Sequence, residues 1–214
     1  YSMTQSAPKA QISATPLPQE RSALVQALLR GVEGIAPIIA RNKAASEHAR
    51  TLAPEVVEAM RDTGLLMMKS PYEVGGAEIH PVDQMAVVEA VTYLDSAAAW
   101  SMFIAATVTG RALSALSDEA IDELFAGGSF PIMAGSLKPS GAAIRVDGGF
   151  QISGQWAWGS GVHHAEYVIV PVLKDDKTGV LTAVVPRAQV RIIDNWYALG
   201  INGSGSSDYA LDDV

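Results

Sequence analysis

The chain has 214 residues, of which 49% are apolar and 18% are charged, so it can bury the core of one large domain or of two modest ones. Its formal net charge of −8 opposes binding to phosphate backbones and anionic lipid head groups, which argues against nucleic acid and membrane surfaces as partners. The chain contains no cysteine, which excludes disulfide frameworks, thiolate metal sites and a cysteine nucleophile.

The first twenty residues are polar and include three prolines, and they lack the basic start and continuous apolar run of a secretory signal. We expect a flexible leader over residues 1–20. The longest apolar run beyond it, Ala97 to Val108, is interrupted by Ser101 and Thr107 and is too short to cross a bilayer. The sequence therefore predicts a cytoplasmic protein.

Residues 21–128 carry apolar side chains at helical spacing and predict a helical domain. In the first stretch we expect Pro37, with two glycines before it, to kink or split the helix. A short helix is predicted over Pro54 to Thr63, with a proline in its first turn and Gly64 as its stop. A third helix is predicted over Val82 to Leu94.

The fourth predicted helix, Ala97 to Leu116, is apolar on nearly all sides, which indicates a central place in the bundle. Ser96 is its expected N-cap. A fifth helix is expected to begin at Ser117 to Glu119, where a capping hydroxyl is followed by acidic charge, and to end at Gly127–Gly128. The helical domain is therefore expected to end near residue 128.

Beta structure is expected from residue 129 onward. Asp147 to Gly149 is typical of a hairpin turn between two short strands, because glycine accepts positive φ. Two β-branched runs follow, Tyr167 to Leu173 and Val180 to Pro186, and a polar turn over residues 174–179 separates them. The predicted fold class is thus α+β, a helical bundle followed by an antiparallel sheet or barrel.

The last residues, Tyr209 to Val214, have the pattern of a strand that ends abruptly, which suggests a missing remainder. Just before them, Gly203 to Ser206 combines glycines, which let a backbone approach a ligand closely, with donor hydroxyls. The alternative for that segment is an ordinary mobile loop.

Three earlier segments also stand out. Pro71 to Gly76 is a turn with two glycines between predicted helices, and Met133 to Ser136 is followed by a Pro-Ser-Gly turn. The segment with sequence GQWAWGSG is the most informative, because Trp156 and Trp158 are two residues apart and would point to the same face of a strand. That face is either a flat aromatic surface for a ligand or an ordinary core layer.

In their order and spacing, these segments resemble the acyl-CoA dehydrogenase superfamily over about residues 21–214. The resemblance implies a helical domain over residues 21–128, a β-domain over residues 129–214 that contacts a flavin (FAD or FMN), and a carboxy-terminal helical domain absent from this sequence. By the same resemblance, the flavin-binding residues are Met133, Gly135, Ser136, Trp158, Ser160, Gly161 and Ser206.

The resemblance is closer to the two-component flavin-dependent monooxygenases than to the dehydrogenases. Dehydrogenases carry an acidic residue after the hydroxyl of the second motif, where this chain has Leu137 and Lys138. They also more often have Thr-Asn-Gly where this chain has Ser160 and Gly161. One departure points the other way, because many such monooxygenases carry a histidine in the helix that here reads Trp100 to Leu116, and this helix has none.

The monooxygenase interpretation implies an oxidoreductase that receives reduced flavin from a separate reductase and transfers one oxygen atom from O2 to a small aromatic or similar molecule. Ser160 would hydrogen-bond near flavin N5. One alternative is an acyl-CoA dehydrogenase that oxidises an acyl thioester at its α and β carbons, and a second is a non-catalytic flavin-binding or scaffolding fragment. A homotetramer is implied if the carboxy-terminal domain is present.

His163 and His164 directly follow the Ser-Gly segment. Adjacent residues on a strand point to opposite faces, so this pair is poorly placed to share one ion, and we expect no metal site. The resemblance places the pair near the edge of the flavin, where His164 is the candidate catalytic residue beside Ser160. A surface or packed histidine is the alternative.

Overall fold

The computed structural model of the protein describes residues 17–175 and 179–214. Most of the leader predicted over residues 1–20, and part of the turn predicted over residues 174–179, lie outside the described residues. Helices come first and strands follow, so the fold class is α+β as the sequence predicts.

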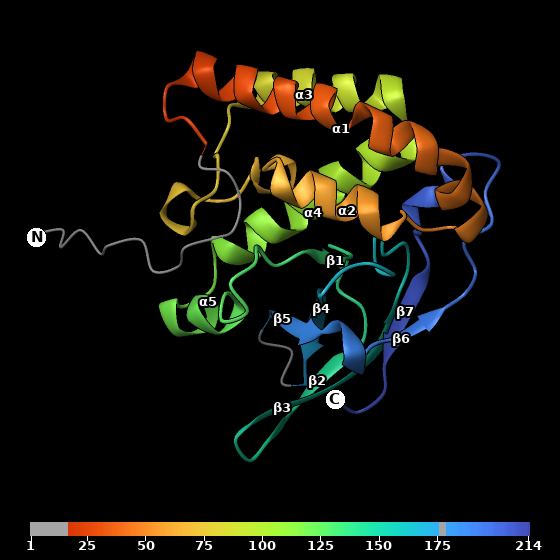
Figure 1. The fold of residues 1–214 in the computed structure, drawn as a ribbon. Coiled ribbons are helices and arrows are strands. Elements are labelled where there is room, and N and C mark those ends of the chain that lie inside the picture. Colours follow the sequence, from red (N-terminus) through yellow and green to blue (C-terminus); the bar gives the residue numbers. More distant parts are fainter. Residues whose placement is uncertain (1–16, 176–178) are drawn as a thin grey trace, which may run out of the picture.

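The helical part forms two layers above the sheet, with α1 and α3 side by side on the outside and α2 and α4 between that pair and the strands (Figure 1). The helices in this part are α1 (Arg21–Ala49), α2 (Pro54–Asp62), η1 (Leu65–Met67), η2 (Tyr72–Val74), α3 (Pro81–Leu94), α4 (Ser96–Leu113) and α5 (Asp118–Leu124). α2 and α5 begin as predicted, at Pro54 and after the Ser117 cap, and Gly64 follows α2 with a φ of 75°.

The first helix corrects one prediction. α1 runs through Pro37 as one helix of 29 residues, so the expected split is wrong. Pro37 is exposed, so the carbonyl that it leaves without a helix partner faces water. The same helix is long and apolar enough to meet a length-and-composition test for a membrane span. Its apolar stripe, however, packs into the helical core through Leu24, Leu28, Val32, Ile35 and Ile39.

The start of α4 corrects a second prediction, that of its N-cap. Asp95, rather than Ser96, is the N-cap, and its Oδ1 accepts hydrogen bonds from Ala97 N at 2.7 Å and Ala98 N at 3.4 Å. A carboxylate at this position satisfies two free N–H groups and favours the positive end of the helix. As predicted, α4 is central, because it contacts both α3 and the first strand.

The second half of the chain forms a seven-stranded curled sheet among the described residues. Its elements are β1 (Met133–Gly135), β2 (Ala142–Val146), β3 (Gly149–Trp156), β4 (Tyr167–Lys174), β5 (Val180–Pro186), η3 (Arg187–Gln189), β6 (Arg191–Ile193), η4 (Asn202–Ser204) and β7 (Asp208–Leu211). The strand order is β1-β4-β2-β3-β7-β6, with β5 on the other edge of β4.

The predicted hairpin is confirmed, since β2 and β3 pair around Gly148, which has a φ of 83°. The sheet is mixed rather than purely antiparallel. β1 and β2 both pair in parallel with β4, one after the other along the same edge. These two pairings join segments that are separated in sequence by other elements, so no local turn signal announces them.

The helical core and the sheet are joined at β1. Met133 and Ile169 belong to the apolar cluster of the helices, and Met133 N donates a 3.1 Å hydrogen bond to Thr109 Oγ1 on α4. Beside this contact, the buried Arg61 pairs with Glu166 at 2.9 Å. These contacts fix β1 and the start of β4 against α2 and α4. They thereby position the sheet and the loops that follow β3 and β6.

Candidate functional site

The segments predicted to hold a ligand meet beside the start of α4. One loop, residues 157–166, follows β3, and the other, residues 194–207, joins β6 to β7. Gly161 N donates a 2.8 Å hydrogen bond to Ser204 O, which ties the two loops together. Two of the three ligand segments expected from the sequence are therefore adjacent in space.

Three buried serines form a line of hydroxyls between these loops and α4. Ser160 Oγ lies 2.8 Å from Ser206 Oγ, which lies 2.8 Å from Ser204 Oγ. At the other end, the indole N–H of Trp100 on α4 donates to Ser160 Oγ at 2.9 Å. We call Ser160, Ser206 and Ser204 the hydroxyl chain.

The hydrogen bonds of this chain have a favoured direction. An indole N–H can only donate, so Ser160 Oγ must accept from Trp100. Ser204 is fully buried, and within the described residues its hydroxyl contacts only Ser206, so Ser204 must donate there to satisfy its proton. Ser206 then donates to Ser160. The oxygen of Ser160 accepts twice, and its own proton remains for an acceptor outside the chain.

Trp158 lies two residues before Ser160, but, contrary to the prediction from strand alternation, it does not share a face with Trp156. β3 ends at Trp156, which is buried and stacks on Tyr209 with ring centroids 5.6 Å apart. Trp158 has a φ of 60° and is 73% exposed, so the two indoles do not share a face, and that prediction is wrong. The left-handed backbone turns the chain out of the strand, and Trp158 N donates to Asp208 Oδ1 at 3.1 Å.

Tyr209 on β7 connects the Ser136 segment to the other two. Its hydroxyl accepts a 2.8 Å hydrogen bond from Ser136 N and donates to Ile169 O at 3.2 Å, and burial raises the pKa of this phenol. Its ring lies against Gly159, where an added Cβ would be 2.7 Å from the ring. Only glycine permits that approach. Ser136 and the Trp-Gly-Ser segment thus both contact the one fully buried Tyr209 side chain, Ser136 at its hydroxyl and Gly159 at the side of its ring.

The other members of the Met133 motif are buried. Met133 has no exposed surface, and its side chain lies in the helical core. Gly135 lies against β4, where an added Cβ would be 2.4 Å from Ile169 O. Ser136 is half-buried, and the residues just after it are exposed. The accessible part of this motif therefore begins at Ser136.

The loop that carries Ser204 and Ser206 is anchored by α1. Glu47 accepts hydrogen bonds from Gly203 N at 3.0 Å and from Asn202 Nδ2 at 2.9 Å. Burial acts to raise the pKa of Glu47, but these hydrogen bonds outweigh it and leave the pKa below its usual value. A Cβ added at Gly203 would lie 3.3 Å from Ala97 Cβ on α4 and 3.4 Å from the Ser46 backbone on α1, so glycine lets the loop approach both helices closely. The anchor fixes one end of the hydroxyl chain.

The two histidines lie in a turn rather than on a strand. His163 is exposed and its Nε2 lies 2.8 Å from Ser207 Oγ, while Nδ1 of the half-buried His164 lies 3.2 Å from Thr51 Oγ1. Burial lowers the pKa of His164 to about 4, with the neighbouring His163 as a smaller cause. His164 is therefore neutral at pH 7 and packs beneath Gly161. No group of three or more potential metal-binding residues occurs in the described part of the chain.

Sequence reasoning missed two residues that organise this site. Trp100 is the donor to Ser160, and Tyr209 is the bridge to Ser136. Trp100 had a usable signal, since it is a large aromatic residue in a helix that begins Ser-Ala-Ala-Ala. Tyr209 had none, because its role depends on strand pairing across the sheet.

Known proteins are similar to this chain in sequence and in fold. Residues 22–125 match the family described as acyl-CoA dehydrogenase, N-terminal domain. A pigment production hydroxylase of a Rhodococcus species (strain ATCC 21145) is 30% identical over 192 residues, which are 87% of this chain and 49% of the hydroxylase. By these two matches, the chain is similar to the acyl-CoA dehydrogenase superfamily, most directly over the domain at residues 22–125.

Other similar proteins are oxygenases. The oxygenase component of p-hydroxyphenylacetate 3-hydroxylase from Acinetobacter baumannii is 29% identical over 190 residues, which are 87% of this chain and 45% of that protein. The crystal structure of the HsaA monooxygenase from M. tuberculosis has a TM-score of 0.78 at 28% identity and covers 89% of this chain. The chain spans about half the length of the relatives it matches.

Proposed function

We propose that this chain is the flavin-holding part of the oxygenase component of a two-component monooxygenase that acts on a small aromatic substrate. The observation that carries the proposal is the free donor at Ser160, which is held by hydrogen bonds from Trp100 and Ser206 and lies beside exposed indoles. Trp158 and Trp100 are 73% and 43% exposed, although large aromatic side chains are usually buried. The named relatives that act as oxygenase components support the same function.

The residues present fit a flavin, FAD or FMN. A flavin ring is flat and apolar on its faces and carries nitrogen and carbonyl acceptors along one edge. Such a ring needs aromatic or apolar walls and a few fixed donors. The Ser160 hydroxyl is such a donor, and Trp158 offers a wall next to it. XiaF from a Streptomyces species, in complex with FADH2 and glycerol, shares the fold with a TM-score of 0.82 at 24% identity.

In this proposal the predicted site residues have different tasks. Ser160 donates a hydrogen bond toward an acceptor near N5 of the ring, and Ser206 and Ser204 orient that donor. Trp158 covers ring surface, while Ser136 and Gly161 border the ring with main chain. Met133 and Gly135 act by fixing the end of β1. The neutral His164 supports Gly161 from below rather than exchanging a proton with substrate at neutral pH.

When bound in its reduced form, a flavin supplies the two electrons with which O2 is split so that one oxygen atom enters an aromatic substrate and the other leaves as water. The chain's own contribution is to exclude water and fix the donor geometry. The buried hydroxyl chain suits that task, because its groups need no rearrangement to offer the Ser160 proton. A separate flavin reductase would supply the reduced cofactor.

We also propose the larger organisation. Residues 21–128 act as the helical domain and residues 129–214 as the β-domain that contacts flavin. A carboxy-terminal helical domain would complete the substrate site and allow a homotetramer. The proposal includes a cytoplasmic location, because the first twenty residues lack the basic start and continuous apolar run of a secretory signal.

The test compares two serine variants of the purified chain. Ser160→Ala removes the donor, and Ser140→Ala is the matched control, because its hydroxyl bonds Gln155 O outside the hydroxyl chain. Titration with FAD and with FMN, followed by flavin fluorescence, should give about tenfold weaker binding for Ser160→Ala only. The preferred flavin identifies the cofactor.

Absence of flavin binding by the unaltered chain would contradict the proposal. The reaction class is tested separately: anaerobically reduced flavin and chain are mixed with oxygenated p-hydroxyphenylacetate, and hydroxylated product is sought by mass spectrometry. Bleaching of oxidised flavin by an acyl-CoA, without hydroxylated product, would favour dehydrogenation instead.

A further inference from the structure

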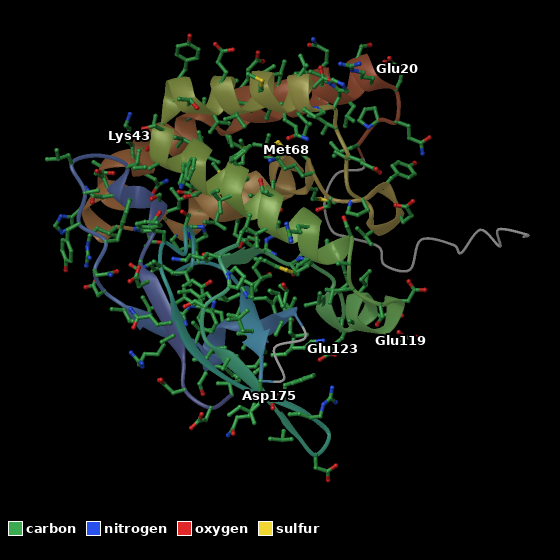
Figure 2. All side chains as sticks on the ribbon, turned by 180° about the vertical axis from the view of Figure 1, so that it is seen from behind. Glu20, Lys43, Met68, Glu119, Glu123 and Asp175 are labelled. Carbon is green, nitrogen blue, oxygen red and sulfur yellow. The ribbon has the colours of Figure 1, made fainter. Side chains whose placement is uncertain are left out.

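Lys69, which follows η1, lies against Phe103 and Thr107 of α4, the helix that also carries Trp100. It directly follows Met68, which is fully buried within the helical layers (Figure 2). The ammonium nitrogen of Lys69 lies 3.6 Å from the centre of the Phe103 ring and donates a 2.6 Å hydrogen bond to Thr107 Oγ1. Thr107 in turn donates to Phe103 O at 2.6 Å. Two α4 side chains therefore fix the position of this cation.

This ammonium has capacity for a further partner. It carries three N–H donors, of which Thr107 accepts one, and the ring face attracts the cation without satisfying the others. Across residues 17–175 and 179–214 no carboxylate forms an ion pair with Lys69. Burial lowers the pKa of the Lys69 ammonium, and no neighbouring anion opposes that shift. A half-buried, oriented cation without an anion is suited to bind an oxyanion.

Lys69 and the Ser160 donor lie at two ends of one strip. Trp100 and Thr107 are seven residues apart on α4, so they lie on the same face about 10 Å apart along the axis. Between them, the Trp100 and Phe103 rings are 6.3 Å apart. We call Trp100, Phe103, Thr107 and Lys69 the α4 strip. Both rings keep some exposed surface, so an aromatic molecule can lie against them.

We propose that Lys69 binds the oxyanion of an aromatic substrate, a carboxylate or a phenolate, whose ring lies along the α4 strip toward Ser160. This inference rests on the proposed function and names its substrate class. The strip thus selects substrates by charge at the end away from the Ser160 donor.

The experiment measures binding of matched probes without flavin. Equilibrium dialysis compares p-hydroxyphenylacetate with its neutral amide, and p-nitrophenolate with p-nitroanisole, so that the carboxylate and phenolate arms are separate. Variants are Lys69→Met, which keeps a long stem without charge, and Lys69→Arg, which keeps the charge. Lys43→Met is the matched control, since Lys43 is an exposed lysine on α1 (Figure 2).

We expect the unaltered chain to prefer at least one anion over its neutral partner by about tenfold. Lys69→Met should abolish that preference with little change for the neutral probe, while Lys69→Arg should retain much of it and Lys43→Met all of it. The arm that shows the preference identifies the oxyanion. No preference in the unaltered chain, or equal loss for both members of a pair in Lys69→Met, would overturn the inference.

Flavin titration of the same variants separates this inference from the proposed function. Normal flavin binding without an anion preference would refute only the role of Lys69. An anion preference that depends on Lys69, in a chain that binds no flavin, would refute only the flavin proposal. Thermal unfolding of Lys69→Met by circular dichroism checks that loss of binding does not reflect loss of fold.

Discussion

The helical core and the hydroxyl chain are both buried, but they are stabilised in different ways. In the helical core, residues such as Leu28 and Met60 are almost fully buried on regular helices, and burial of their apolar surface itself stabilises the fold. The hydroxyl chain buries polar groups on loops whose backbone is left-handed at Trp158 and Ile201. Buried hydroxyls gain little net stability and must satisfy one another. Of these two regions, the helical core therefore contributes more to stability, and the loops carry the proposed ligand contacts.

The largest effect should come from the helical core. Leu28→Ala removes a fully buried side chain from α1 and should lower the free energy of unfolding by about 2–5 kcal/mol. Urea unfolding followed by circular dichroism measures the change. Leu29→Ala, one residue away and only partly buried, is the control and should cost clearly less. Equal costs for the two variants would argue against a helical core organised on this face.

A second prediction concerns pH and the loop that carries Ser160. The pKa of His164 is about 4 in the folded protein and 6.5 in the unfolded chain. Between these values the unfolded chain binds a proton that the folded protein does not, so stability falls as pH falls from about 6.5 to 4. The full difference amounts to about 3 kcal/mol or less.

Urea unfolding at a series of pH values tests this prediction. Replacement His164→Gln should flatten the slope of stability against pH within that window, because glutamine does not titrate. Carboxylates such as Asp83, whose pKa is lowered by Arg21, titrate at lower pH and contribute in both proteins. An unchanged slope in the variant would show that His164 is not protected from protonation.

Tyr209→Phe should have an intermediate effect on stability and should also weaken flavin binding. The change leaves Ser136 N without its acceptor and Ile169 O without its donor in a buried place, at a cost of about 1–3 kcal/mol. Because Ser136 is released, flavin affinity should fall as well. Tyr167→Phe is the control, since Tyr167 is only partly buried and lies on the helical side of the sheet. Loss of stability without loss of flavin affinity would show that Ser136 does not contribute to flavin binding.

Local signals were enough to predict much of the fold. Pro54 and Gly64 bound α2, the Ser117 hydroxyl caps α5, and Gly148 turns the hairpin, and each acts through the conformation of its own few residues. Pro37 misled the prediction because its effect depends on which side of α1 faces water, and that is set by tertiary packing. The parallel pairings of β4 likewise depend on distant segments.

The site was predictable in its segments but not in its contacts. Resemblance to a family selected Ser160 and Ser206, and the structure places their hydroxyls 2.8 Å apart. The direction of the hydrogen bonds came from Trp100 and Ser204, which no local pattern connects to Ser160. Alternation along β3 failed at Trp158, because a left-handed tryptophan cannot be read from a pattern of period two.

The smallest stability effect should come from Trp158→Gly, although its functional effect should be large. A left-handed φ of 60° costs an ordinary residue about 1–2 kcal/mol, which glycine avoids, while the greater freedom of glycine in the unfolded chain costs about 0.5–1 kcal/mol. The exposed indole contributes little burial, so the free energy of unfolding should change by less than about 1 kcal/mol.

Flavin affinity should fall about tenfold in the same variant if the indole covers the ring. Trp158→Phe, which keeps a flat ring, should retain most of the affinity. Parallel urea unfolding and flavin titration measure both quantities on one preparation. A variant that binds flavin normally would mean that the strained tryptophan serves another partner, and the contrast between a stabilising core and a ligand-directed loop would then rest on the hydroxyl chain alone.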